Sequence, residues 1–344
     1  MFFASDNSGP AHPEVMAALA EANEGYAMAY GADALMDEVR EKIREVFEAP
    51  EAAVYLVATG TAANSLALAT LCQPFQTVFC SPVAHIHEDE CNAPEFYTAG
   101  AKLTLVPGED KMTADALRST IAAEETRGVH GPQRGPVAIT QVTERGSVYT
   151  LEELQALCAV AKEYDLPVHL DGARFANALV ALNCSAADMS WKAGVDAISF
   201  GGTKNGLLGA EAVVFFDPAK AWEFELRRKR GAHLFSKHRY LSAQMAAFLR
   251  DDLWLRSARQ ANDNAKRLAD GLRAKGAEFL HEPQANMIFA AFPRAKHHDL
   301  FNKGAMYHLW GGSMEGDPDE MLACRLVCDW SISHEQIDAF LDLV

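Results

Sequence analysis

The chain alternates short apolar runs with helical patterns from about residue 50 to about residue 230, and this alternation constrains its fold more than any other feature. Apolar runs separated by helices are typical of parallel strands, because the connecting helices cover both faces of the sheet. We therefore predict an α/β domain with a mostly parallel sheet. Its strands are expected at residues 52–57, 77–80, 103–106, 136–141, 166–170, 195–200 and 211–216.

The pattern changes near residue 237 to long helices, one short strand at residues 286–291 and a final helix that begins at Ser333. Ser333 and Gln336 have the spacing of a helix cap, as do Thr150 and Glu153 in the first part of the chain. We expect an N-terminal arm and large domain in residues 1–235, followed by a smaller C-terminal α+β lobe in residues 236–344.

The charge balance excludes several classes of partner. The 344 residues include 47 acidic and 31 basic side chains, for a formal net charge of −16. This charge repels phosphate backbones and anionic membranes, so we expect no nucleic acid and no membrane partner. The chain begins without a basic leader, and no run approaches the roughly 20 apolar residues of a membrane helix. Together with seven cysteines that lack paired spacing, these features favour a cytoplasmic protein with reduced thiols.

A glycine-containing turn, Thr59-Gly60-Thr61, follows the first expected strand and opens a helix. Free N–H groups and the dipole at a helix N-terminus favour an anion, and glycine lets the backbone approach it closely. A plain strand-to-helix turn would use the same residues. Neither a GxGxxG motif nor a Walker lysine motif occurs at this turn, which argues against dinucleotides and nucleoside triphosphates.

Two further expected strands end in charged residues. Asp171 closes the run at 166–170, and Lys204 follows the run at 195–200, 33 residues later. Taken singly, Asp171 fits a loop ion pair with Arg174, and Lys204 fits a solvated lysine. Their separation accommodates one crossover, which would bring both to the carboxyl edge of neighbouring strands. A lysine that forms a Schiff base, an aspartate that neutralises a pyridinium and a phosphate turn together indicate pyridoxal 5'-phosphate.

Six segments, in this order along the chain, resemble the threonine aldolase family. They are SDN at 5–7, YG at 30–31, TGTAAN at 59–64, AH at 84–85, DGAR at 171–174 and TKNG at 203–206. DGAR combined with the lysine motif is the specific part. The resemblance implies the aspartate-aminotransferase-like pyridoxal-phosphate fold type I. The segments SPVAHIHEDECNAPEF and RRKRGAHLFSK are similar to the low-specificity branch, which also accepts phenylserine.

The resemblance also implies roles for site residues, with no metal among the ligands. His85 would stack on the pyridine ring and take part in proton transfer, and arginines would bind the substrate carboxylate. The expected catalytic residues are Lys204, His85 and Glu144. The expected cofactor-binding residues are Thr59, Gly60, Thr61, His85, Asp171, Arg174, Thr203, Lys204 and Lys237. The expected substrate-binding residues are Ser5, Tyr30, Arg174 and Arg325.

Two alternatives and one departure accompany these assignments. Residues 85–91, HIHEDEC, also allow a metal cluster, although residues two apart do not share a helix face. The basic run at 227–230 is either a solvated helix face or, with Lys237, a source of cations for the cofactor phosphate across a dimer interface. Many threonine aldolases carry a histidine in an ENTHNG-like segment, whereas this chain has Glu144 followed by Arg145.

The activity that the resemblance implies is cleavage of L-3-hydroxy amino acids at Cα–Cβ to glycine and an aldehyde. Threonine, allo-threonine and phenylserine are the expected substrates. The alternative is a β-eliminating lyase or an aminotransferase that acts on small amino acids. Fold type I also implies a homodimer or a homotetramer built as a dimer of dimers.

Overall fold

The apolar runs of the first two thirds of the chain form one seven-stranded sheet in the order β1-β7-β6-β5-β4-β2-β3. β7 is antiparallel to both β1 and β6, and every other neighbouring pair is parallel. The prediction of a mostly parallel sheet with seven strands is confirmed. The strands are β1 (Ala53–Val57), β2 (Gln76–Cys80), β3 (Lys102–Leu105), β4 (Gln133–Thr140), β5 (Val168–Gly172), β6 (Ala197–Gly201) and β7 (Glu211–Phe215).

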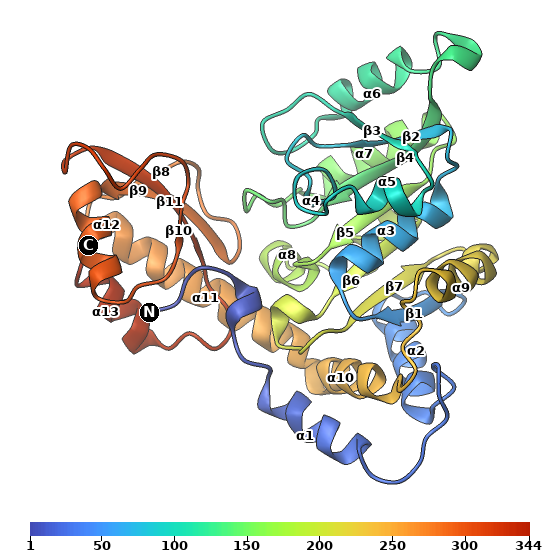
Figure 1. Ribbon diagram of the computed structural model, residues 1–344, viewed down its shortest axis with the longest axis horizontal. Coiled ribbons are helices and arrows are strands. Elements are labelled where there is room, and N and C mark those ends of the chain that lie inside the picture. Colours follow the sequence, from blue (N-terminus) through green and yellow to red (C-terminus); the bar gives the residue numbers. More distant parts are fainter.

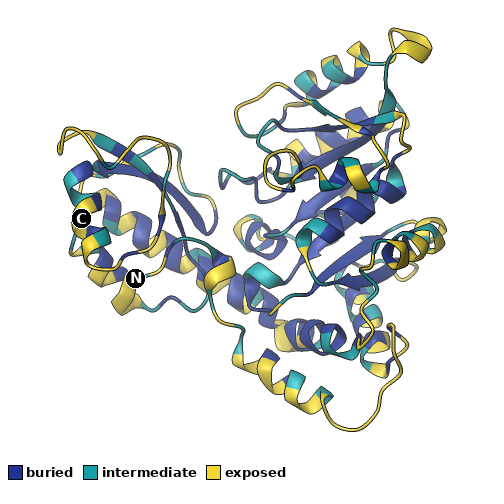
Figure 2. Ribbon diagram, in the orientation of Figure 1, coloured by how far each residue is buried: buried dark blue, intermediate teal, exposed yellow.

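Helices cover this sheet, as expected for parallel strands joined by crossovers. The capping box predicted at Thr150 and Glu153 is present, with both reciprocal hydrogen bonds. The helices of the large lobe are α1 (Pro13–Ala22), α2 (Ala34–Val46), α3 (Gly60–Leu71), α4 (His85–Glu88), α5 (Ala93–Tyr97), α6 (Ala114–Ala123), α7 (Leu151–Glu163), α8 (Phe175–Leu182), α9 (Ala221–Arg230) and α10 (Arg239–Leu249). α3 is buried almost all round and lies at the centre of the lobe (Figure 2).

A smaller lobe holds a four-stranded antiparallel sheet in the order β10-β11-β9-β8. The strand expected at 286–291 is confirmed as β9, and the final helix is capped by Ser333, whose side chain accepts from the N–H of Gln336. The elements of this lobe are α11 (Leu253–Ala274), β8 (Glu278–Phe279), β9 (Met287–Pro293), α12 (Arg294–Asn302), β10 (His308–Leu309), β11 (Met321–Val327) and α13 (His334–Leu341).

The computed structural model describes residues 1–344, and α11 runs between the two lobes (Figure 1). Its first residues, Leu253 and Trp254, belong to the large hydrophobic core, whereas Leu268 and Leu272 belong to the core of the small lobe. The N-terminal arm also reaches the small lobe, where Phe3 is fully buried. The domain division near residue 235 stays a prediction, since one helix serves both cores.

None of the helices combines the length and the apolar character that crossing a membrane requires.

Candidate active site

Asp171 and Lys204 lie at the carboxyl edge of adjacent parallel strands. Asp171 is in β5, directly opposite Ser199 of β6, and Lys204 lies in a 3-10 turn (Thr203–Asn205) that follows β6. Both side chains line a cavity of about 350 Å³. Its walls are Asn7, Ala58, Thr59, Gly60, Thr61, Asn64, His85, Glu90, Asp171, Ala173, Ser199, Gly201, Thr203, Lys204, Leu208, Gly209 and Glu211.

The N-terminus of α3 forms one wall of this cavity. Thr59 caps the helix by accepting from the N–H of Ala62, while the N–H groups of the first helical residues have no partners within the helix. A Cβ at Gly60 would meet no heavy atom within 4 Å, so the space above the turn is open. A phosphate group fits this wall in both charge and room.

The cavity contains the chemical groups that pyridoxal phosphate needs. The α3 N-terminus suits its phosphate, the carboxylate of Asp171, which is only 4% exposed, suits a protonated ring nitrogen, and Lys204 supplies an amine for its aldehyde. The residues present therefore fit this cofactor.

A hydrogen-bonded chain connects Asp171 to His85. Asn64 Nδ2 donates to Asp171 Oδ2 at 2.8 Å and to Glu90 Oε1 at 2.9 Å, and His85 Nδ1 lies 2.9 Å from the same Glu90 oxygen. The hydrogen bond to Glu90 raises the pKa of His85, and the charges of Asp171 and Glu144 act in the same direction, although burial opposes them. His85 is thus part of a network of buried polar groups at the cavity wall.

Arg174 faces an internal carboxylate. Its Nε and Nη2 donate to the two oxygens of Asp6 at 2.7 and 3.0 Å, and Asn286 of the small lobe donates to the same carboxylate at 3.1 Å. Burial alone would raise the pKa of Asp6, but the charges of Arg174 and Lys204 and the hydrogen bonds hold it below its ordinary value. One edge of the guanidinium is therefore occupied by Asp6, and Arg174, whose side chain is 6% exposed, does not line the cavity.

Arg325 and Glu144 lie near Arg174 without lining the cavity. Arg325 Nη2 donates to the carbonyl of Ala4 at 3.3 Å, and its buried Nε has no hydrogen-bond partner. Burial opposes the charged form of Arg174, but the charges of Asp6 and then Glu144 raise its pKa, and Glu144 also counteracts the lowering of the Arg325 pKa by burial. Arg145 Nε is also buried and has no hydrogen-bond partner, so this atom forms no hydrogen bond that would hold the Glu144 carboxylate away from a substrate.

Six of the predicted site residues lie outside the cavity wall: Glu144, Arg174 and Arg325, described above, and Ser5, Tyr30 and Lys237. The hydroxyl of Ser5 accepts from the N–H of Asn7 and so caps the first 3-10 turn, which Asp6 begins. Tyr30 and Lys237 are exposed, and the N–H of Tyr30 donates to the carbonyl of Ser236, so the two residues belong to neighbouring loops. Within one chain, neither reaches the space between Lys204 and Asp171.

Ten residues of the cavity wall were not predicted as site residues, among them Asn7, Asn64, Glu90 and Glu211. Glu211 accepts from the hydroxyl of Thr203 and from the N–H of Gly202, which fixes the turn that carries Lys204. Burial raises the pKa of Glu211. A charged residue at the start of an otherwise apolar strand was the available sequence signal for Glu211.

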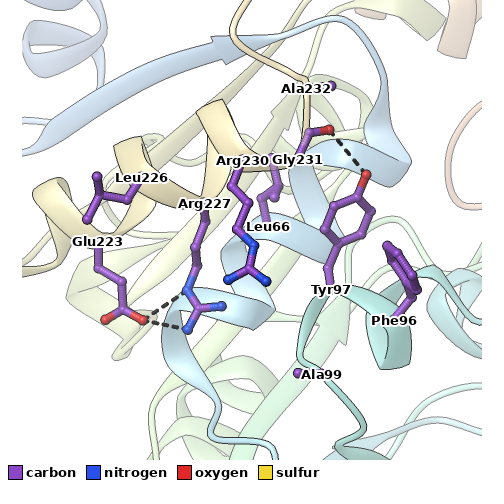
Figure 3. A pocket seen from close by; sticks show the side chains of 10 residues that line it. All are labelled: Leu66, Phe96, Tyr97, Ala99, Glu223, Leu226, Arg227, Arg230, Gly231 and Ala232. Atoms are coloured by element: carbon purple, nitrogen blue, oxygen red, sulfur yellow. Dashed lines mark hydrogen bonds and ion pairs between the residues drawn. The ribbon is translucent and has the colours of Figure 1, made fainter.

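The basic run at 227–230 lies at a different cavity, of about 640 Å³, between α9, α3 and α5 (Figure 3). Arg227 and Arg230 project into it, and Arg227 is paired with Glu223 at 2.7 Å. The two cavities share no residue. No three His, Cys, Asp or Glu side chains are grouped in a way that could hold a metal ion, and His87 in the HIHEDEC segment is exposed.

Comparisons with known proteins agree with this geometry. The family model described as "Beta-eliminating lyase" matches residues 3–294. A "Low specificity L-threonine aldolase" of Pseudomonas aeruginosa is 41% identical over 97% of this chain and 94% of its own length. A solved threonine aldolase of Leishmania major superposes with a TM-score of 0.92 at 26% identity, covering 99% of this chain and 98% of that one. A serine palmitoyltransferase of Sphingomonas wittichii, with a TM-score of 0.72 at 16% identity over 100% and 86% of the two chains, shares the fold.

The fold and the cavity define a pyridoxal-phosphate enzyme of fold type I, and the family match makes it a lyase. The chain belongs to the beta-eliminating lyase family, in its threonine aldolase branch.

We predict that Lys204→Ala abolishes covalent attachment of the cofactor, since no other lysine lines the cavity. The purified variant should lack the visible absorption band of lysine-bound pyridoxal phosphate, while the phosphate wall still retains some cofactor. Absorption spectra of both proteins, with the exposed Lys192→Ala as a matched control, measure the effect. A Lys204→Ala protein with normal absorption and turnover would contradict the assignment.

Proposed function

We propose that this protein is a low-specificity L-threonine aldolase that cleaves L-3-hydroxy amino acids at Cα–Cβ to glycine and an aldehyde. The observation that carries the proposal is the pairing of Lys204 and Asp171 in one cavity beside the N-terminus of α3. The similarity to the Pseudomonas aeruginosa enzyme supports the choice of aldolase chemistry among the reactions of this fold.

Each side chain of the site has one task in this reaction. Bound pyridoxal phosphate supplies an electron sink for the electrons of the broken carbon–carbon bond. Asp171 would hold the ring nitrogen protonated, and Lys204 would supply the amine that attaches the cofactor. Arg174 Nη1 and Arg325 bind the substrate carboxylate. His85 would lie against the cofactor ring and accept the proton of the substrate hydroxyl.

A coupled assay for aldehyde release tests the proposal with threonine, allo-threonine and phenylserine as substrates. Equal amounts of glycine and aldehyde support aldolase activity. Ammonia with a keto acid would instead indicate the β-eliminating lyase, and transfer of the amino group to an added keto acid would indicate an aminotransferase.

A neutral group at position 171 should slow the reaction without loss of the fold. Asp171→Asn keeps the size of the side chain, but an amide does not hold the ring nitrogen protonated as a carboxylate does. We expect kcat to fall by more than about tenfold. Single-turnover kinetics with threonine measure it. A kcat within about twofold of the parent, a barrier change below about 1 kcal/mol, would show that Asp171 lacks this role.

Substrate choice depends on what lies beside the substrate hydroxyl. Glu144 is close enough to His85, Arg174 and Arg325 for its charge to influence the pKa of all three. An ionised carboxylate accepts hydrogen bonds and does not donate them. As a carboxylate, Glu144 therefore offers no donor that would select one hydroxyl configuration. We propose weak stereochemical discrimination at Cβ.

The two Cβ isomers should therefore be cleaved with similar kcat/KM, because neither leaves a buried polar group unpaired. Glu144→His introduces an imidazole that can donate a hydrogen bond, so this variant should discriminate more strongly between the two isomers. Measuring kcat/KM for L-threonine and L-allo-threonine on both proteins tests this. A preference above about a hundredfold in the parent enzyme, roughly 2.7 kcal/mol, rules it out.

We further propose a cytoplasmic homodimer, or a homotetramer made of two such dimers. All seven cysteines are free, which suits a reducing compartment. Large apolar side chains are exposed on the loops that carry Tyr30 and Lys237, among them Tyr26, Met28 and Phe235. Exposed apolar groups of this size are typical of contact surfaces, which supports a neighbouring subunit that brings Tyr30 or Lys237 to the cavity.

A mixing experiment tests this arrangement. If Lys237 serves the partner's cavity, Lys237→Ala and Lys204→Ala proteins should each be inactive, and hybrids made by mixing them should regain activity at one site in two. Sedimentation at assay concentration gives the oligomeric state. Fully active monomers would exclude the shared site.

A further inference from the structure

The side-chain amide of Asn64 lies between two buried carboxylates. Its nitrogen donates to Asp171 Oδ2 and to Glu90 Oε1, at 2.8 and 2.9 Å. An amide nitrogen carries two hydrogens, one for each of these acceptors. The opposite orientation would direct the amide oxygen at two carboxylate oxygens, so the donor roles in this chain are fixed.

This fixes the tautomer of His85. The Glu90 oxygen that accepts the hydrogen bond from Asn64 also lies 2.9 Å from His85 Nδ1. With Glu90 as a carboxylate, this oxygen has no hydrogen to donate, so the ring nitrogen donates and the proton of the neutral imidazole is on Nδ1. The imidazole forms no other hydrogen bond, and the side chain is 27% exposed at the cavity wall. Nε2 is therefore left with a free lone pair.

The network is costly for stability, which favours a functional reason for it. The side chain of Glu90 is completely buried, and burial raises its pKa against the opposing effect of the bonds from His85 and Asn64. Glu90 Oε2 and Asn64 Oδ1 are buried without any partner. Unpaired buried acceptors destabilise a folded protein, and native proteins keep them mainly at functional sites.

We propose that Glu90 is a positioning residue for the aldolase reaction. Together with Asn64, it holds His85 with the proton on Nδ1 and leaves Nε2 free to accept the proton of the substrate hydroxyl. The hydroxyl proton moves to Nε2, the ring becomes an imidazolium, and the carboxylate of Glu90 stabilises the new positive charge. The proposal rests on the proposed aldolase function, to which it adds a residue that does not touch the substrate.

Asn64 extends this arrangement to the far side of the cofactor site. Because it bonds to Asp171 as well as to Glu90, the carboxylate for the ring nitrogen and the carboxylate behind the base belong to one hydrogen-bonded unit. The charged groups that act on His85 are Glu90, Asp171 and Glu144. Of these three residues, only Glu90 forms a hydrogen bond with the imidazole of His85.

Nitrogen-15 NMR of histidine-labelled, full-length protein tests the proposal directly, with and without pyridoxal phosphate. A His85→Asn variant identifies the His85 signals among the 12 histidines. We expect the neutral ring to be protonated at Nδ1 in the parent protein. In Glu90→Gln the amide oxygen still accepts from Nδ1, so the tautomer should persist while the imidazole pKa falls by about one unit. In Glu90→Ala the ring should lose this fixed tautomer.

Kinetics add an independent measurement. Glu90→Gln should lower kcat for threonine by about tenfold, part of the 10²–10⁴ that general base catalysis contributes, and leave KM within about twofold. A neutral His85 is the active base, so the acidic limb of the kcat/KM profile should move to lower pH as the imidazole pKa falls. Glu88→Gln changes an exposed glutamate of the same segment and should leave the profile unchanged.

The two proposals can fail separately. His85 protonated at Nε2 in the parent protein, or the same tautomer and pKa in all Glu90 variants, overturns the positioning role even if threonine is cleaved. The expected NMR result without aldehyde release overturns the aldolase function and keeps the hydrogen-bond assignment. Should Glu90→Ala not fold, the pKa and pH profile of Glu90→Gln still decide the question.

Discussion

The parallel pairing of β4, β5 and β6 is the constraint on which the rest of the site depends. Parallel strands end at the same edge of a sheet, so the segments that follow them are brought together whatever their separation along the chain. Asp171 and the turn that holds Lys204 meet at this edge because their strands are neighbours in register. The N-terminus of α3 reaches the same cavity and adds its dipole. The backbone thus fixes the anion wall and the positions from which the side chains of Asp171 and Lys204 enter the cavity.

A buried ion pair between Asp6 and Arg174 connects distant parts of the chain near this edge of the sheet. Asp6 comes from the N-terminal arm, Arg174 from the loop after β5, and Asn286 from the small lobe, so three distant parts of the chain meet at one carboxylate. A buried ion pair of this kind contributes little net stability, because desolvation offsets the attraction, whereas an unpaired partner is costly. Its value lies in orientation, since Asp6 fixes two of the three nitrogens of the guanidinium.

Much of the fold was readable from the sequence, because buried parallel strands produce unbroken apolar runs. β11 was not predicted. Only alternate residues such as Leu322, Cys324 and Leu326 are buried in it, and the run is interrupted by Arg325. The roles of Lys204 and Asp171 could be predicted from the sequence, because both residues follow apolar strands and their separation fits one crossover. The network of Asn64 and Glu90 could not, since Asn64 bonds to Glu90 and Asp171 across 26 and 107 residues and buried polar pairing leaves no local periodicity. The same holds for Asp6, whose partner Arg174 is 168 residues distant.

α11 has a mechanical consequence for the molecule. It is one continuous helix of 22 residues whose first turns are packed in the large core and whose later turns are packed in the small one. A continuous helix transmits bending and local unfolding between the bodies that it joins, because its backbone hydrogen bonds run without a break. We therefore expect the small lobe to be coupled to the large one through α11, so that loss of order in one core destabilises the other.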